Sequence, residues 1–389
     1  MEEIQMIDHA AGKAEILALA LLALTMSGCD LFGDDDEEPV ITTQSVVVAN
    51  GGNFGDQNGY LSFYDPESGA VDGSDDLGGF AHAVAIRQGE IFVLLNTFTT
   101  GRISIVDAAT GSVLRQVQGL PGPRGIAFID DARAMVSNLS PFGETGPQPA
   151  EVSVFNSLSG VVEEESIQVG IYPEGLVEHG GRVFVANSGN LGDGTTLTII
   201  NVATTEPAGA IDLGCDGPNE IFVDGEGELV VVCEGKVVYN DDFTQIIEQT
   251  VGQIVVVNPS TETVASRTVL TTQAGSENGS QSAYLDGITG ELYVIDSSSG
   301  SIYRYNTVTN TMAATLQAPD SVDLVGLAAV AYDGLTAKLY IARLARGAGG
   351  FPDFSASGAV VVLDRSGNQI DRFTVGPAPS HIEFLRAAE

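Results

Sequence analysis

Three histidines, His82, His179 and His381, are the side chains of the main body of the chain best suited to acid–base work or metal binding at neutral pH. None stands in a Ser/His/Asp or Cys/His arrangement with a spacing that favours nucleophilic catalysis. His82 and His381 begin strands that we expect to be equivalent in adjacent repeats, which allows a shared metal or an acid–base pair. The alternative is that each caps a strand or bonds to backbone, and no catalytic residue is assigned.

Two near-identical loops, NGGNFGD and NSGNLGD, begin at Asn50 and Asn187. Their amide and carbonyl oxygens, together with one carboxylate, are ligands that calcium accepts, so Asn50, Asp56, Asn187 and Asp193 are weak metal candidates. Asn and Gly also tolerate left-handed backbone conformations. A structured turn is therefore the competing interpretation, and no cofactor is required.

A third set of residues is typical of a binding surface. Arg124, Glu174 and Asn219 each follow a proline that opens a strand, which places polar groups around one rim of the fold. Aromatic side chains beside a few polar groups are the usual make-up of a contact surface for a small molecule or a protein. The candidate ligand-binding residues are Arg124, Glu174, Asn219, Phe142, Tyr239, Phe243, Arg343, Arg346, Phe351 and Phe354, with Phe54 and Phe98 in shorter loops.

The elements that position these residues form a repeat. An apolar strand that ends in Asp or Asn, followed by x-x-Ser/Thr, recurs seven times at spacings of 42 to 58 residues. This period, with about four strands per unit, is that of propeller blades. We therefore predict an all-β fold, a seven-bladed β-propeller of four-stranded blades. The repeated strands end at Asp65, Asp107, Asn156, Asn201, Asn258, Asn306 and Asp364.

Ring closure is predicted from the two ends of the repeat region. The first repeat starts at SVVVAN (45–50), a second-position strand without a first strand before it. The tail PSHIEFL from Pro379 matches the first-strand openings at Pro123, Pro173 and Pro218. A C-terminal strand that pairs into the first blade would leave no unpaired edge.

Loop lengths distinguish the two faces of such a ring. Connections from second to third strands vary from four residues after Asp296 to nineteen after Cys233, whereas turns on the opposite face stay short. Variable loops on a rigid scaffold commonly carry binding sites. The face of the second-to-third loops and the blade crossings, here named the long-loop face, is therefore the candidate site, and the opposite face is named the short-turn face.

The charge balance is strongly acidic, with 52 acidic against 16 basic residues and a formal net charge of -36. Such a field repels nucleic acid and anionic lipid headgroups, so we expect no nucleic-acid partner. The same composition is typical of a surface adapted to high salt, where screening removes self-repulsion.

The N-terminus has the features of an export segment. An apolar run from Ile16 to Met26 is too short for a permanent membrane span but suits a signal-peptide core. The small residues before Cys29 resemble a bacterial lipobox, which implies a lipid-modified Cys29 followed by an acidic linker. We expect a lipoprotein signal peptide over 1–28, the linker over 29–40 and the propeller over 41–389. In an oxidising compartment the remaining cysteines, Cys215 and Cys233, are expected to form a disulfide.

Two segments carry a family resemblance. VVVANGGNFGDQNGYLSFYDPESGAV resembles the opening blade of surface β-propeller lipoproteins of Bacteroidota, and VFVANSGN followed by TLTIINVATTEPAGAIDLG resembles the YVTN/YncE-like repeats. The resemblance implies a propeller and lipid anchoring at the outer membrane or cell surface. Members of the surface group capture corrinoids or ferric siderophores for a TonB-dependent outer-membrane transporter.

These observations together favour a non-enzymatic lipoprotein that binds a small molecule or a protein partner on its long-loop face. An anionic ligand of the corrinoid or siderophore class would depend on Arg124, Arg343 or Arg346. The alternatives are a quinoprotein-like or lyase-type propeller enzyme, which the scarcity of His and the absence of Trp disfavour, and a structural envelope protein.

Overall fold

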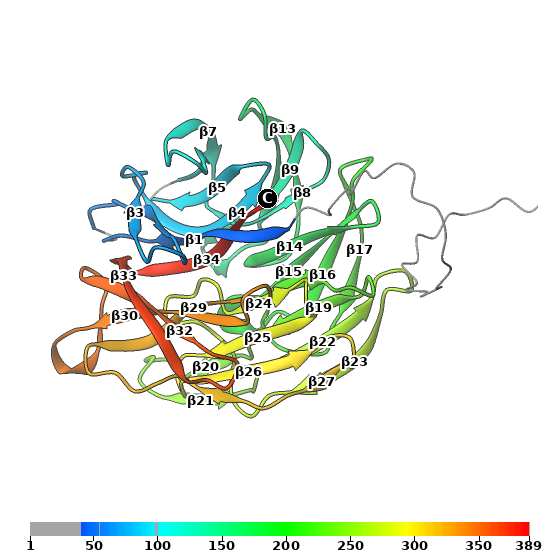
Figure 1. Ribbon diagram of the computed structural model, residues 1–389. Helices are drawn as coiled ribbons and strands as arrows, with labels where there is room; N and C mark the ends of the chain where they lie inside the picture. Colours follow the sequence, from blue (N-terminus) through cyan, green and yellow to red (C-terminus); the bar gives the residue numbers. More distant parts are fainter. Residues whose placement is uncertain (1–39, 54, 98–99, 389) are drawn as a thin grey trace, which may run out of the picture. The chain divides into compact units, whose positions relative to one another are not determined.

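Seven antiparallel sheets, each of four main strands, follow one another around a ring in the computed structural model (Figure 1). The structure describes residues 40–53, 55–97 and 100–388, and Ile41–Glu389 forms one compact unit. Cys29, the predicted signal peptide and linker, Phe54 and Phe98 lie outside the described residues. The seven-bladed propeller predicted from the repeat is confirmed.

The strands of each blade are given from the channel outward. Blade 1 contains β34 (Pro379–Ala388), β1 (Ile41–Asn50), β2 (Tyr60–Tyr64) and β3 (Val71–Gly73). Blade 2 contains β4 (Phe80–Arg87), β5 (Glu90–Asn96), β6 (Gly101–Asp107) and β7 (Val113–Leu120). Blade 3 contains β8 (Pro123–Phe128), β9 (Arg133–Asn138), β12 (Glu151–Asn156) and β13 (Val162–Gln168). Blade 4 contains β14 (Pro173–His179), β15 (Arg182–Asn187), β16 (Thr196–Asn201) and β17 (Glu206–Asp212).

The last three blades follow the same order. Blade 5 contains β18 (Pro218–Val223), β19 (Leu229–Cys233), β22 (Gln253–Asn258) and β23 (Thr263–Val269). Blade 6 contains β24 (Ala283–Asp286), β25 (Glu291–Asp296) and β26 (Ser301–Asn306), and the short strands β27 (Thr311–Met312) and β28 (Leu316–Gln317) both pair with β26. Blade 7 contains β29 (Leu324–Asp333), β30 (Lys338–Arg346), β32 (Ser357–Leu363) and β33 (Gln369–Pro377).

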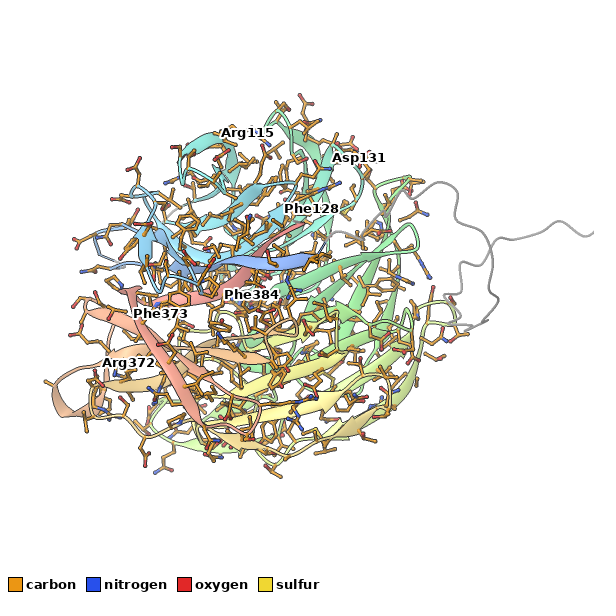
Figure 2. All side chains as sticks on the ribbon, viewed as in Figure 1. Arg115, Phe128, Asp131, Arg372, Phe373 and Phe384 are labelled. Atoms are coloured by element: carbon orange, nitrogen blue, oxygen red, sulfur yellow. A yellow bond between two sulfur atoms is a disulfide. The ribbon has the colours of Figure 1, made fainter. Side chains whose placement is uncertain are left out.

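The C-terminal strand closes the ring in blade 1, as predicted. β34 pairs antiparallel with β1 from Ile41↔Ala388 to Asn50↔Pro379, and the two lie side by side in Figure 1. Phe384 of β34, labelled in Figure 2, packs edge-on against Tyr284 of blade 6 and Tyr340 of blade 7. The chain ends are therefore joined by a full strand ladder and by aromatic contacts to the neighbouring blades.

An ion-pair cluster adds to this closure. Arg386 of β34 lies 3.4 Å from the Asp333 carboxylate and 3.7 Å from that of Asp286, and both acids are buried. Such charges are stable inside a protein only when they are paired, so Arg386 holds blades 6 and 7 against the C-terminal strand.

The core lies between adjacent blades. The inner strands are buried on both faces, so their sequences are continuous apolar runs. In one such contact, Val46 and Val48 of β1 pack with Ala329, Ala342 and Val360 of blade 7. Burial of one such aliphatic side chain contributes about 1.5–3 kcal/mol. Interlocking of each sheet with its neighbours makes the inner strands a rigid frame around the central channel.

The turns of the short-turn face follow from side-chain chemistry. Asp107 Oδ1 accepts hydrogen bonds from the Thr110 amide and hydroxyl, both at 2.8 Å, and Asn306 Oδ1 does the same with Thr309. These contacts confirm that the repeated Asp or Asn and Ser/Thr are turn formers. The second strands of blades 1, 5 and 6 end at Asn50, Cys233 and Asp296, as predicted.

The long-loop face carries additional elements. β10 (Phe142–Gly143) and β11 (Gly146–Pro147) form a hairpin in blade 3, and β20 (Val237–Tyr239) and β21 (Ile246–Gln249) form another in blade 5. Single 3-10 turns follow in blades 4 and 7, η1 (Asn190–Gly192) and η2 (Ala348–Gly350), the latter before β31 (Pro352–Asp353). The described residues include no helix with the length and hydropathy needed to span a membrane.

Candidate functional site

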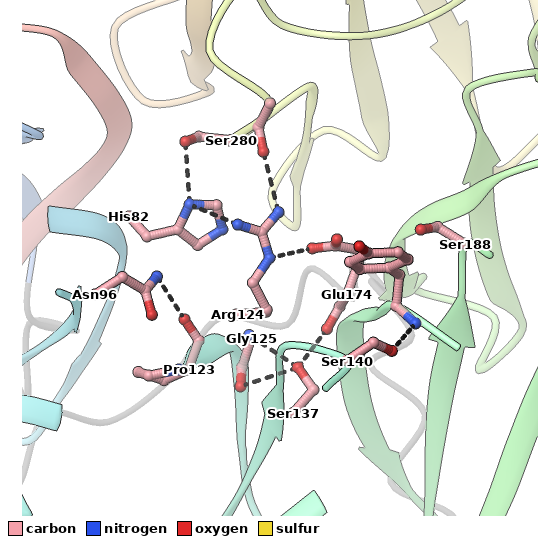
Figure 3. Close-up of polar contacts among 12 residues, drawn as sticks. His82, Asn96, Pro123, Arg124, Gly125, Ser137, Ser140, Glu174, Ser188 and Ser280 are labelled. Carbon is pink, nitrogen blue, oxygen red and sulfur yellow. Dashed lines mark hydrogen bonds and ion pairs between the residues drawn. The ribbon is translucent and has the colours of Figure 1, made fainter. Parts of the chain in front are cut away.

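The rim residues predicted from the strand openings converge at the long-loop end of the channel. Arg124, Glu174 and Asn219 are the second residues of β8, β14 and β18, the inner strands of three consecutive blades. Arg124 Nε donates a 2.7 Å hydrogen bond to Glu174 Oε2, and both side chains are largely buried (Figure 3). Burial raises the pKa of Glu174, and the charge of Arg124 opposes that rise. The prolines thus place these side chains where the channel opens.

His82 lies beside this ion pair. Arg124 Nη1 is 3.3 Å and Ser280 Oγ is 3.2 Å from His82 Nδ1, as Figure 3 shows. A guanidinium group can only donate, so Nδ1 is the acceptor and carries no proton. Burial, and then the charges of Arg124 and His381, hold the pKa of His82 well below its usual range. His82 is therefore a neutral hydrogen-bond acceptor inside the channel.

The segment before β24 crosses the channel mouth. Arg124 Nη2 donates to the Gly279 carbonyl oxygen at 3.2 Å. Gln281, which is buried, accepts a bond from the Ile382 amide at 3.0 Å and donates to the Ile382 carbonyl at 3.3 Å. Blade 6 is thereby joined to blades 1, 2 and 3 across the ring. Sequence reasoning missed this contact, and no local pattern in the sequence indicated it.

Two further carboxylic acids face the same space. Burial raises the pKa of Glu220 to about 8, and the charges of Glu234 and Glu174 add to this effect, while the Ser282 amide donates to Glu220 Oε1 at 3.1 Å. Burial likewise raises the pKa of Glu234 to about 7; the side chains of Ser282 and Asn219 oppose the rise and the charge of Glu174 adds to it. Near neutral pH these groups share protons because like charges in a buried site cannot all ionise. Sequence reasoning missed both residues, although Glu220 directly follows Asn219 at the rim.

Two neighbouring cavities with shared lining residues result. The mouth pocket, with a volume of about 490 Å³, is lined by Arg124, Tyr172, Glu174, Asn219, Glu234 and Tyr239 together with loop glycines. The channel cavity, with a volume of about 220 Å³, shares Arg124, Glu174 and Asn219 and adds His82, Glu220 and Gln281.

Glu234 is held in place by the disulfide and by close backbone contacts. Cys215 and Cys233 are joined, as predicted, and the Glu234 amide donates to the Gly217 carbonyl at 2.8 Å. A Cβ atom at Gly217 would lie 2.8 Å from the Gly235 carbonyl oxygen, and Gly217 has a φ of 67°. Only glycine fits this approach without strain. The wall that carries Glu234 is therefore fixed covalently and sterically.

Two tyrosines complete the mouth pocket. Tyr172, in the crossing from blade 3 to blade 4, has a φ of 46°, and its amide donates to Ser140 Oγ at 2.7 Å. A bulky residue in this backbone region persists only where its surroundings hold it. Tyr239, on β20, lies with its ring centroid 5.9 Å from that of Phe243.

The other predicted binding residues are distributed differently. Arg343 is buried and donates to the carbonyl oxygens of Pro319 (2.6 Å) and Gly326 (3.1 Å), and Arg346 donates to that of Leu324 at 2.8 Å. These two guanidinium groups therefore have structural partners within blade 7. The remaining candidate aromatics project from long loops outside the mouth pocket and are exposed: Phe142, Phe243, Phe351 and Phe354.

The two asparagines among the weak metal candidates have structural partners as well. Asn50 Nδ2 donates to Ser62 Oγ at 2.9 Å, and Asn187 Nδ2 donates to Thr198 Oγ1 at 2.9 Å. Both Asn side chains are buried at the ends of second strands, which agrees with a structured turn. Asp56 and Asp193 follow in the loops, and no group of three or more His, Cys, Asp or Glu within the described ranges could hold a metal ion.

A cavity of about 1130 Å³ lies at the short-turn end of the channel, where its lining includes Glu90, Glu178 and Arg386. The charges there already have partners: Arg115 binds Glu90 through two bonds of 2.7 and 2.5 Å, and Arg386 pairs with buried acids. Glu178 Oε1 accepts a hydrogen bond of 2.8 Å from the Gly181 amide. This cavity is larger, but Glu90, Glu178 and Arg386 in its lining already have partners within the fold.

Known proteins resemble this chain in fold only. No family model matches the chain, and no curated protein matches its sequence. Hydrazine synthase from Kuenenia stuttgartiensis is similar in structure, with a TM-score of 0.58 and 17% identity over 81% of this chain and 97% of that one. A candidate 6-phosphogluconolactonase from Bacteroides fragilis has a TM-score of 0.60 and 12% identity over 88% and 98% of the two chains. A protein of unknown function from Desulfotomaculum acetoxidans has a TM-score of 0.59 and 13% identity over 88% and 99%. Propellers of this kind include enzymes and non-enzymes.

Proposed function

We propose that this protein is an exported, lipid-anchored propeller that binds a small molecule in the mouth pocket without transforming it. The observation that carries the proposal is the convergence of Arg124, Glu174 and Glu234 with Tyr172 and Tyr239 around one pocket of about 490 Å³. A concave site with convergent polar groups and perturbed carboxylic acids is the usual form of a binding site.

Binding is favoured over catalysis by the state of the titratable groups. The Ser280–His82 contact places a hydroxyl next to an imidazole, which is the geometry of an activated nucleophile. Burial, and then the charge of Arg124 beside the same imidazole, lower the pKa of His82, so this histidine is a poor acceptor for the serine proton. Ser280 is itself buried. The pair therefore supports the channel wall and not a hydrolytic reaction.

Lipid anchoring and kinship with the surface lipoproteins of Bacteroidota and the YVTN/YncE-like repeats are part of the proposal. They are supported by the residues around Cys29 and by the two segments that resemble these proteins. Anchoring at the outer membrane or cell surface suits capture of a ligand and its transfer to an outer-membrane transporter.

The test is retention of small molecules. The purified protein is incubated with a small-molecule extract of its own cells, washed and analysed by mass spectrometry. We expect the wild type to retain at least one compound whose mass is unchanged by the incubation. The Tyr239→Ser variant should not retain that compound. Phe142→Ser is the matched control, because Phe142 is an exposed aromatic on another hairpin of the same face, outside the mouth pocket. Retention that survives Tyr239→Ser and Glu234→Gln, or conversion of the compound to a product, would contradict the proposal.

A further inference from the structure

The positive charges around the mouth pocket are already neutralised, whereas part of the negative charge is not. Arg124 is paired with Glu174 at 2.7 Å, and Lys236 at the rim is paired with Glu248 at 2.7 Å. Within the described residues, neither Glu220 nor Glu234 has an ion-pair partner. A buried carboxylate without a cation is unfavourable, so the pocket lacks positive charge.

A second observation concerns the surroundings of the Glu234 carboxyl group. The side chains of Ser282, which is fully buried, and Asn219 lower the pKa of Glu234 through hydrogen bonds. Such neutral partners favour the ionised form, but no cation is paired with Glu234 within the described residues. The carboxyl group is therefore prepared to carry a charge that a ligand can complement.

From these contacts we propose that the mouth pocket binds an organic ammonium compound, with Glu234 as its counter-charge and Tyr172 and Tyr239 in its walls. This inference rests on the proposed function and names the ligand class of the same site. Aromatic rings attract ammonium groups through the negative face of the ring system. The pocket is far larger than one inorganic cation, and the described residues hold no metal-binding group, which favours an organic cation.

The ligand class differs from the anionic ligand expected from the arginines. Arg343 and Arg346 donate to backbone carbonyl oxygens, and Arg124 is paired with Glu174. An anion would have to displace Glu174 from Arg124 inside a site that also contains Glu220 and Glu234. A cation meets no such competition.

Proton release gives an independent readout. Glu234 lines the mouth pocket together with Arg124 of β8 and Glu174 of β14, and its charge also acts on Glu220 of β18. Burial raises the pKa of Glu234 to about 7, so part of the protein carries a proton on this group near neutral pH. A bound cation stabilises the ionised form and expels that proton.

The experiment compares choline with 3,3-dimethylbutan-1-ol, its neutral isostere of the same shape. Isothermal titration calorimetry of the purified protein at pH 7, in two buffers of different ionisation enthalpy, gives both affinity and proton release. We expect choline to bind at least about tenfold more tightly than the isostere, with proton release, and Glu234→Gln to remove that preference. Glu144→Gln, on an exposed residue of the same face, should leave the affinity unchanged.

Each alternative outcome overturns the inference. Equal affinity for choline and the isostere, no binding of choline, or choline binding that survives Glu234→Gln would each show that no ammonium site exists. If choline fails while an extract compound is still retained through Tyr239, the proposed function stands and only the ligand class is wrong. If choline does not bind and no extract compound is retained, both the ligand class and the proposed function are wrong. A thermal melt of Glu234→Gln establishes that the variant is folded.

Discussion

Replacement of Glu220 by Gln should stabilise the protein increasingly as the pH rises from 5 to 9. Burial, reinforced by the charges of Glu234 and Glu174, raises the pKa of Glu220 from 4.5 to about 8 in the folded protein. Between these values the folded state holds a proton that the unfolded state has lost, so the stability contributed by this group falls with increasing pH. The Gln variant keeps a neutral side chain throughout and escapes this loss.

The magnitude follows from the size of the pKa change. One pKa unit corresponds to about 1.4 kcal/mol, so the loss has an upper bound of about 5 kcal/mol. Glu220 is partly exposed to the channel and shares its proton with Glu234, which reduces the effect. We expect Glu220→Gln to gain roughly 1–3 kcal/mol relative to the wild type between pH 5 and pH 9. The Gln side chain retains an oxygen that can accept the hydrogen bond from the Ser282 amide.

Urea unfolding of both proteins at pH 5, 7 and 9 measures this difference. Repulsion among the many surface acids also grows with pH, but it is common to both proteins and cancels in the comparison. Glu144→Gln removes one acidic side chain from an exposed position and controls for net charge. A Glu220→Gln difference that is equal at pH 5 and pH 9, or that decreases with pH, would refute the assignment of Glu220 as a buried, proton-sharing acid.

Three other predictions concern anchoring and closure. Cys29→Ser should release the protein from membranes; equal incorporation of labelled fatty acid into the variant would exclude lipidation at this residue. The Cys215→Ser/Cys233→Ser double variant should lose about 3 kcal/mol of unfolding free energy in denaturant titrations, because the disulfide restricts the unfolded chain; unchanged stability would contradict this. Truncation before Pro379 removes the partner of β1 and the Arg386 ion pairs, so cooperative thermal unfolding should be lost, whereas an unaltered melting curve would show that β34 is dispensable.

The blades, their order and the closing strand could be predicted because they depend on local patterns. Period-two apolar strands, the Asp or Asn turns such as that at Asp107, and the proline openings at Pro123 and Pro173 each act within a few residues. The C-terminal tail matched the first-strand pattern that the first repeat lacked. The disulfide could be predicted because Cys215 and Cys233 bracket one hairpin.

The composition of the candidate site was decided by the ring. Closure brings His82 within 3.2 Å of Ser280 although 198 residues separate them, and no local pattern encodes that contact. The sequence around Glu220 and Glu234 does not distinguish them from other acids on strands; only the packing of neighbouring blades around the channel reduces their exposure to solvent and raises their pKa values. The arginines show the converse. Arg343 and Arg346 stood out in the sequence as rare cations. The tertiary structure buries Arg343 among carbonyl oxygens, because a buried guanidinium group must satisfy its donors wherever the chain supplies acceptors, and the exposed Arg346 also donates to a carbonyl oxygen.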